Sequence, residues 1–249
     1  MGFTPEQLSR DTFLGNKIYI WQPLTGYRAA TDPVLLAAAC PASAGQTVLD
    51  LGCGVGTAGL CLSHRVPVAC WGLELQEDYA TLARRNAAEN NLNMQVITGD
   101  LSAMPAELRE MSFDHVITNP PFFGAGKPAP DLGRARARQE QIDLAIWIDA
   151  ALKRLKPKGW LTLIHRAERL PEVIAALNNR AGSIEIKPLA PRAGRQANRF
   201  ILTARKGSKG AAKLHAPLIL HEGPTHDRDR DDYSADAKLI LRNGEKLKF

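Results

Sequence analysis

The sequence predicts an α/β fold: a mainly parallel sheet with helices on both faces. Two apolar runs, at 48–51 and 113–118, fit buried parallel strands, which are hydrophobic almost throughout because both faces of the sheet are covered. A third run, at 68–73, follows a glycine-rich turn and a helix, and strands alternating with helices are typical of parallel sheets. With 249 residues, 45% of them hydrophobic, the chain can form one α/β domain with a sizeable core.

The segment before the first predicted strand divides into two parts. Residues 1–30 are expected to be irregular, because glycines and prolines interrupt them. A short apolar helix should follow and end before Pro41. Its N-cap is expected to be Thr31 or Asp32, with Pro33 at the first helical position, where a missing N–H costs nothing.

The remaining elements follow from hydrophobic spacing and from capping residues. Helices are expected over 76–90, 141–155 and 171–179, and strands over 94–98, 160–164, 183–187, 200–204 and 217–221. The mixed-charge run at 226–232 is expected to be a surface loop.

A glycine-rich turn follows the first predicted strand. Gly52, Gly54 and Gly56 have the spacing G-x-G-x-G, which differs from the G-x-G-x-x-G of dinucleotide-binding proteins, and no lysine follows, which disfavours a triphosphate-binding loop. Glu74 ends the next strand, where an acid can accept both hydroxyls of a ribose. Asp100 follows the third strand and can accept from an adenine amino group. Alone, the turn is weak evidence, and either acid could simply cap a helix or begin a loop.

The most informative motif is Asn119-Pro120-Pro121-Phe122, which follows the strand at 113–118. Two prolines cannot donate to a sheet, so the strand should stop there with Asn119 as its last residue. Its position is then the carboxyl edge of the sheet, where open α/β folds bind ligands. The Asn119 side-chain oxygen and the Pro120 carbonyl can both accept from one exocyclic NH2 group, and Phe122 offers a flat face for stacking.

These motifs together resemble those of class I S-adenosylmethionine-dependent methyltransferases of the N-P-P-[YF] amino group. The resemblance rests on Asp-Leu-Gly-Cys-Gly-Val-Gly at 50–56, on Glu74 and Asp100, and on Asn-Pro-Pro-Phe at 119–122. Within that group, 119–124 and the segment 27–37 are most similar to bacterial tRNA adenine-N6 methyltransferases that modify position 37 of valine tRNA. The likeness extends from about residue 13 to about residue 204.

The resemblance implies a Rossmann-like fold, with a mostly parallel seven-stranded sheet and a terminal antiparallel hairpin. It implies one domain over 1–249, made of a cap segment (1–30), a catalytic core (31–206) and a C-terminal extension (207–249) whose role it does not explain. S-adenosyl-L-methionine is the implied cofactor. The implied cofactor-binding residues are Asp32, Asp50, Gly52, Cys53, Gly54, Gly56, Glu74, Leu75, Asp100, Leu101 and Asn119. The implied catalytic residues are Asn119, Pro120 and Phe122.

The expected function is N-methylation of an exocyclic amine on structured RNA, with adenine N6 of a tRNA as the favoured target. Guanine N2 of ribosomal RNA and a protein glutamine N5 are the alternatives, because the Asn-Pro-Pro-Phe box occurs in enzymes of all three kinds. A non-enzymatic RNA-binding scaffold is a further alternative, which the intact box argues against.

The net charge of +6 favours an acidic partner such as RNA. Basic residues gather in two segments, at 134–138 and at 192–213. Both are expected to contact phosphates, although such runs are as often simply solvated. The expected RNA contacts are Phe123, Lys127, Arg134, Arg136, Arg138, Arg192 and Arg195.

The four cysteines show no C-x-x-C spacing and are expected to be reduced thiols, not a disulfide frame or a zinc site. The histidines lack ligand-spaced partners, so no metal is expected. Because the sequence carries no signal peptide or membrane span, a cytoplasmic protein without a membrane partner is expected. A monomer or weak dimer is also expected.

Overall fold

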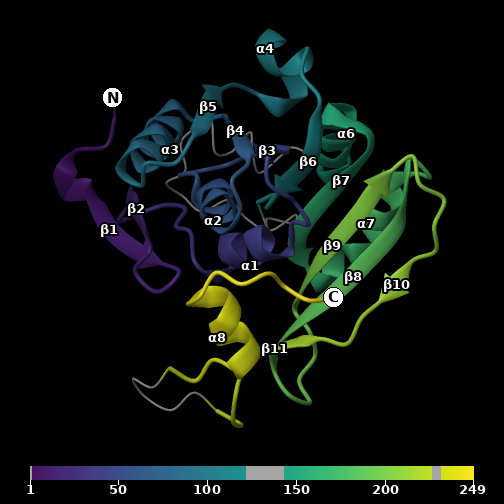
Figure 1. Ribbon diagram of the computed structural model, residues 1–249. Helices are drawn as coiled ribbons and strands as arrows, with labels where there is room; N and C mark the ends of the chain where they lie inside the picture. Colours follow the sequence, from purple (N-terminus) through teal and green to yellow (C-terminus); the bar gives the residue numbers. More distant parts are fainter. Residues whose placement is uncertain (1, 122–142, 226–230) are drawn as a thin grey trace.

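The computed structural model describes residues 2–121, 143–225 and 231–249 (Figure 1). A 3-10 turn, η1 (Pro5–Gln7), precedes an antiparallel hairpin of β1 (Leu8–Phe13) and β2 (Ile18–Pro23). The expectation that residues 1–30 are irregular was therefore wrong. Leu14, Gly15 and Asn16 all have positive φ and form the tight turn between the strands, so the glycine marks a hairpin turn.

The main sheet has nine strands within the described residues, in the order β10-β8-β9-β7-β6-β3-β4-β5, with β11 also paired to β8. Neighbours from β5 to β7 are parallel, and β9 is antiparallel to both β7 and β8. The expected seven strands and terminal antiparallel hairpin are confirmed, and β10 and β11 extend the sheet. The strands are β3 (Thr47–Leu51), β4 (Ala69–Glu74), β5 (Met94–Thr98), β6 (Phe113–Thr118), β7 (Leu155–Arg166), β8 (Ala181–Arg192), β9 (Arg199–Lys206), β10 (Lys213–Leu214) and β11 (Leu218–His221).

Helices cover both faces of this sheet (Figure 1). One core cluster joins Ile117 and Ile164 to apolar residues of α1, α2, α3 and α8. The other joins Val116 and Leu161 to residues of α6 and α7. Successive strand residues thus point to opposite faces. The helices are α1 (Thr31–Ala39), α2 (Thr57–Arg65), α3 (Glu77–Glu89), α4 (Ala106–Arg109), α6 (Leu144–Arg154), α7 (Leu170–Leu177) and α8 (Ala235–Leu241), with short 3-10 turns η2 (Leu101–Ala103) and η3 (Ala167–Arg169).

Three local expectations need correction. The N-cap of α1 is Ala30, because Thr31 and Asp32 already belong to the helix. The strand β6 ends at Thr118, so Asn119 is the first residue after it. In the helix expected over 141–155, hydrophobic spacing places Ile146 on the apolar face, but it is 43% exposed in α6; Trp147 and Ile148 face the core instead.

The segment after β9 packs against the rest of the fold. Ala237, Ile240 and Leu247 are buried in the same cluster as α1, and the Leu247 N–H donates to the Ala38 carbonyl over 2.9 Å. Asp232 pairs with Arg192 at 2.6 Å and so fixes this segment to β8. Across the described ranges, no helix combines the length and hydropathy needed to cross a bilayer.

Candidate active site at the carboxyl edge of the sheet

The turn after β3 requires its glycines. Gly52, Gly54 and Gly56 have φ values of 76°, 55° and 86°, which disfavour any side chain. The N–H groups of Gly52 and Cys53 donate to the Leu73 carbonyl over 2.8 and 2.9 Å, so the turn is fixed to β4. A Cβ at Gly52 would lie 2.7 Å from Cζ3 of Trp147, so packing also excludes a side chain there.

Two buried acids stabilise this turn. Asp50 accepts from the Gly59 N–H at the start of α2 over 2.9 Å. Burial raises the pKa of Asp50 to about 7; the Gly59 hydrogen bond acts against this shift and the Glu74 charge reinforces it. The Glu74 carboxylate accepts from the N–H groups of Gly54 and Gln76, both over 2.9 Å. Glu74 therefore links the glycine turn to the start of α3.

Two narrow cavities meet at Gly52. One is lined by Tyr27, Ala29, Pro33, Asp50, Gly52, Cys53, Val55, Thr57, Ala58 and Asn119. The other is lined by Gly52, Leu73, Leu75, Gly99, Asp100, Leu101 and Trp147. Most of the expected cofactor residues line one cavity or the other, and Gly54, Gly56 and Glu74 shape the turn between them.

Asn119 contributes an unused acceptor to the first cavity. Its side-chain oxygen is buried and has no hydrogen-bond partner among the described residues. A buried oxygen without a partner is costly in a folded protein and points to a donor that arrives with a ligand. Pro120 follows directly, whereas Phe122 lies outside the described residues.

Asp100 and Asp32 already have protein partners. The Asp100 carboxylate accepts from the N–H and hydroxyl of Ser102 over 2.8 and 2.6 Å, which caps η2. Asp32 lies in the first turn of α1 and pairs with Arg199 at the start of β9. Burial raises the pKa of Asp32, and the Arg199 charge opposes that shift. Asp32 does not line either cavity; its neighbour Pro33 does.

The expected RNA contacts are only partly described. Phe123, Lys127, Arg134, Arg136 and Arg138 lie outside the described residues. Arg195 is exposed in the β8–β9 connection, and its contact with RNA remains a prediction.

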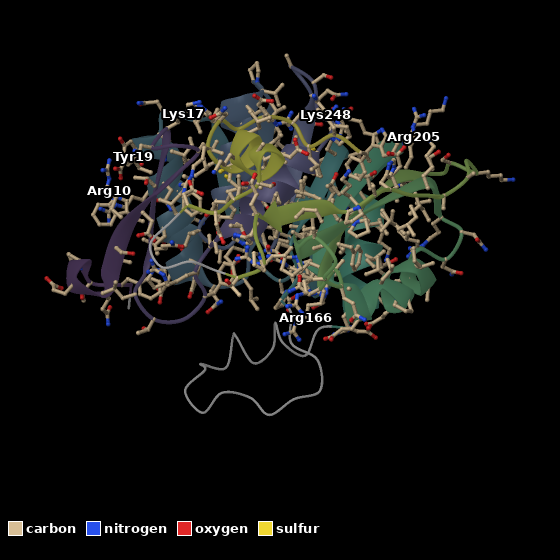
Figure 2. The ribbon with its side chains drawn as sticks, turned by 90° about the horizontal axis from the view of Figure 1, so that it is seen from below. Arg10, Lys17, Tyr19, Arg166, Arg205 and Lys248 are labelled. Atoms are coloured by element: carbon tan, nitrogen blue, oxygen red, sulfur yellow. The ribbon has the colours of Figure 1, made fainter. Side chains whose placement is uncertain are left out.

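Arg192 is largely buried, and its guanidinium bonds to Asp232 and to the carbonyls of Glu222 and Gly223. Its contact with RNA also remains a prediction. Arg166 is the last residue of β7, and the parallel register of β6 and β7 puts it at the same edge of the sheet as Asn119. Figure 2 shows Arg205 and Lys248 on the other side of the molecule from Arg166.

Two aromatic residues at the site were not anticipated. Tyr27 contacts the turn at Gly54, and Trp147 contacts it at Gly52. Tyr27 lies within a motif that the sequence does highlight, but Trp147 is 95 positions from Gly52. Nothing local to either position predicts the contact.

The four cysteines are buried free thiols, as expected. Among the described residues, no cluster of histidine, cysteine or acidic side chains is placed to hold a metal.

A glycine turn follows β3, Glu74 ends β4, Asp100 follows β5 and an asparagine-proline pair follows β6. Together these features define a class I methyltransferase. The chain belongs to the methyltransferase small domain family, whose model matches residues 30–186. It is accordingly an enzyme that transfers methyl groups.

Sequence relatives and solved structures agree with this assignment. A Porphyromonas gingivalis protein named tRNA1(Val) (adenine(37)-N6)-methyltransferase is 35% identical over 173 residues, which cover 66% of this chain and 68% of the relative. An Aeromonas hydrophila protein of the same name is 29% identical over 205 residues, covering 81% and 86%. The crystal structure of a predicted O-methyltransferase from Agrobacterium tumefaciens has 28% identity and a TM-score of 0.69, covering 87% and 98% of the two chains. A Pyrococcus furiosus methyltransferase, at 20% identity and a TM-score of 0.57 over 77% and 90%, shares the fold.

Proposed function

We propose that the protein transfers a methyl group from S-adenosylmethionine to the exocyclic N6 amine of an adenine in tRNA. The observation that carries this proposal is the buried Asn119 oxygen, an acceptor without a described partner in the cavity beside the glycine turn. The names of the relatives support adenine in tRNA as the target.

The residues present suit this cofactor. S-adenosylmethionine carries positive charge on its sulfur and on its amino group. Asp50 lines one cavity, Glu74 accepts from the Gly54 N–H of the adjoining turn, and the glycines of that turn allow close approach to the backbone. Asp50, Gly52, Cys53, Leu75, Asp100 and Leu101 are the residues proposed to hold the cofactor. When bound, it supplies an electrophilic methyl group on a good leaving group.

Asn119 and Pro120 are proposed to hold the reacting amine. The lone pair of adenine N6 is spread into the ring, so the amine is a weak nucleophile. Two acceptors, the Asn119 side-chain oxygen and the Pro120 carbonyl, would each bind one N–H group at about 3 Å. This favours a more tetrahedral nitrogen with its lone pair available. Positive charge grows on the nitrogen during transfer, and the same two oxygens stabilise it.

Proton removal requires no strong base in this scheme. The nitrogen gains a methyl group, the sulfur becomes a neutral thioether, and the extra proton on nitrogen leaves to solvent. The main contribution of the protein is then to position the two reactants. Phe122 is proposed to stack on an extruded base, a contact typically worth about 1–3 kcal/mol.

The test is methyl transfer from tritiated S-adenosylmethionine to total tRNA from a strain that lacks the gene, followed by nucleoside chromatography. Labelled N6-methyladenosine that is lost with Asn119→Ala is the expected result. The same assay is run on ribosomal RNA and on a release factor. Label in 2-methylguanosine of ribosomal RNA, or in glutamine of the release factor, would identify one of the alternative amines as the substrate instead of adenine. Binding of the cofactor with no transfer to any of the three substrates would contradict the proposal.

A further inference from the structure

Tyr27 lies at the centre of the candidate site although it belongs to the connection between β2 and α1. Its ring lies against the glycine turn, because a Cβ at Gly54 would be 3.3 Å from Cε1 of Tyr27. The same ring lines the cavity that holds Asp50 and Asn119. Tyr27 is thus a wall of the cavity in which the reacting amine is proposed to bind.

The main chain around Tyr27 is fixed from two sides. The Tyr27 N–H donates to the Tyr79 hydroxyl of α3 over 3.1 Å. The next residue, Arg28, donates to the Ser9 hydroxyl and the Pro23 carbonyl over 2.9 and 2.6 Å and pairs with Asp11. The N-terminal hairpin and α3 therefore hold this segment in place over the glycine turn.

Gln22 of β2 adds another hydrogen bond, because its side-chain oxygen accepts from the Ala29 N–H over 2.8 Å. Gln22 is 1% exposed, so this contact is shielded from water. These hydrogen bonds join Gln22 and Pro23, which precede Tyr27, to Ala29 and Arg28, which follow it. They fix the main chain around Tyr27 and so limit where its ring can lie.

The surroundings of the Tyr27 ring favour a cation. Tyr27 as a whole is 41% exposed, but desolvation of its phenol raises the pKa of that group. The charges of Asp32, Asp50 and Glu74 raise this pKa further, and the side-chain amide of Asn119 lowers it. The phenol therefore stays neutral at any physiological pH. The acids Asp32, Asp50 and Glu74 lie near it, and Asp50, whose pKa is about 7, is only partly ionised at neutral pH. An aromatic face with anionic neighbours attracts positive charge and repels negative charge.

We propose that Tyr27 contacts the sulfonium of the cofactor and makes the site prefer charged S-adenosylmethionine over its neutral product, S-adenosylhomocysteine. The inference rests on the proposed function. In-line transfer requires the methyl donor to lie about 3–3.5 Å from the amine held by Asn119. A residue that shares the Asn119 cavity therefore flanks the donor. Loss of the positive charge after transfer removes the cation–π attraction, which favours release of the product.

The test is calorimetric titration of the wild type, Tyr27→Phe and Tyr27→Leu with S-adenosylmethionine and with S-adenosylhomocysteine. Cation–π contacts contribute about 0.5–2 kcal/mol, so Tyr27→Leu should weaken the affinity for S-adenosylmethionine by about 2- to 30-fold. The affinity of that variant for S-adenosylhomocysteine should change by less than about twofold. Tyr27→Phe, which keeps the ring, should retain the wild-type ratio of the two affinities.

Phe3→Leu is the matched control, because Phe3 packs edge-on against Tyr79 with ring centroids 5.6 Å apart and does not line the cavity. It disturbs the support of Tyr27 without removing the ring. Equal losses of both affinities in Tyr27→Leu, or no loss of either, would overturn the role of Tyr27. If the wild type bound neither compound, the proposed function itself would fail, so the two failures are distinguishable.

Discussion

The side-chain amide of Asn86 binds both main-chain groups of Trp21. Its oxygen accepts from the Trp21 N–H over 2.8 Å and its NH2 group donates to the Trp21 carbonyl over 3.0 Å. The same NH2 group donates to the Val55 carbonyl over 2.9 Å. One turn further along α3, Asn90 makes the same pair of contacts with Tyr19. Four helical residues rise about 6 Å and two strand residues about 6.8 Å, so helix and strand match in spacing.

Replacing Asn86 with alanine should destabilise the fold more than replacing Asn90. Asn86 is fully buried, and its loss leaves polar groups of Trp21 and Val55 without their partner. Unsatisfied buried groups cost about 1–3 kcal/mol each, and three groups lose a partner, so the free energy of unfolding should fall by about 3 kcal/mol or more. Urea denaturation measures this. Asn90→Ala, at a partly exposed position, should cost less. Equal effects would mean that the link to Val55 adds nothing.

Replacing Asn119 with alanine should lower kcat by about 100-fold or more while the affinity for S-adenosylmethionine changes little. The expected loss is typical of removing one oxygen or N–H that stabilises charge in a transition state. Single-turnover kinetics and equilibrium dialysis give the two quantities separately. Parallel losses in rate and affinity would assign Asn119 to the cofactor alone.

Gly52→Ala should be more damaging than Gly194→Ala, although both positions have positive φ. Residue 52 has φ of 76° and a Cβ there would overlap Trp147, whereas residue 194 has φ of 73° and nothing within 4 Å of a Cβ. Backbone strain costs about 1–2 kcal/mol at either site, and overpacking adds about 1–3 kcal/mol at Gly52. Thermal unfolding of both variants separates the two effects. Similar shifts in Tm would show that Trp147 moves aside freely.

Asp50→Asn should change how stability depends on pH. Burial raises the pKa of Asp50 to about 7, so between about pH 4 and pH 7 the folded state binds a proton that the unfolded state does not. The unfolding free energy of the wild type then falls as pH rises through this window, by at most about 1.4 kcal/mol per pH unit. The unfolding free energy of Asp50→Asn minus that of the wild type should therefore rise from pH 4 to pH 7. Above pH 7 this difference should stay constant.

Asp114→Asn provides the opposite case for the same measurement. Burial raises the pKa of Asp114, but hydrogen bonds from Thr47 and Lys156 outweigh it and lower the pKa to about 2. The stability that Asp114 contributes is present above about pH 4 and is lost as pH falls toward 2. Between pH 5 and 8 the effect of Asp114→Asn should be constant. Urea denaturation at several pH values measures both variants. If the difference in unfolding free energy between Asp50→Asn and the wild type did not change with pH, Asp50 would not bind a proton in the folded state.

The sequence predicts best what local pattern determines. The apolar runs of β3 and β6 and the positive-φ glycines need only their own neighbours, so both the sheet and the turn follow from spacing. The hairpin of β1 and β2 was missed because Asn86 and Asn90, some 65 to 71 positions away, bind its backbone. Contacts at such separations leave no periodic signal in either segment.

The site shows the same division. The acids and Asn119 follow predicted strands, and their shared edge is a consequence of parallel topology. Trp147 reaches Gly52 only because α6 packs across the sheet, a contact that helix spacing alone cannot place. The sequence suggests that Arg192 contacts a phosphate of RNA. In the structure, Asp232, forty positions later, already binds its guanidinium.

The hydrogen bond between the Leu247 N–H and the Ala38 carbonyl constrains the order of events during synthesis. Until residues up to Leu247 have left the ribosome, the side of α1 that α8 and Leu247 cover stays exposed to solvent. The parallel strands and the glycine turn can assemble earlier, from residues that emerge first. A chain that lacked α8 and Leu247 would therefore keep the parallel strands and the glycine turn but leave one apolar side of α1 uncovered.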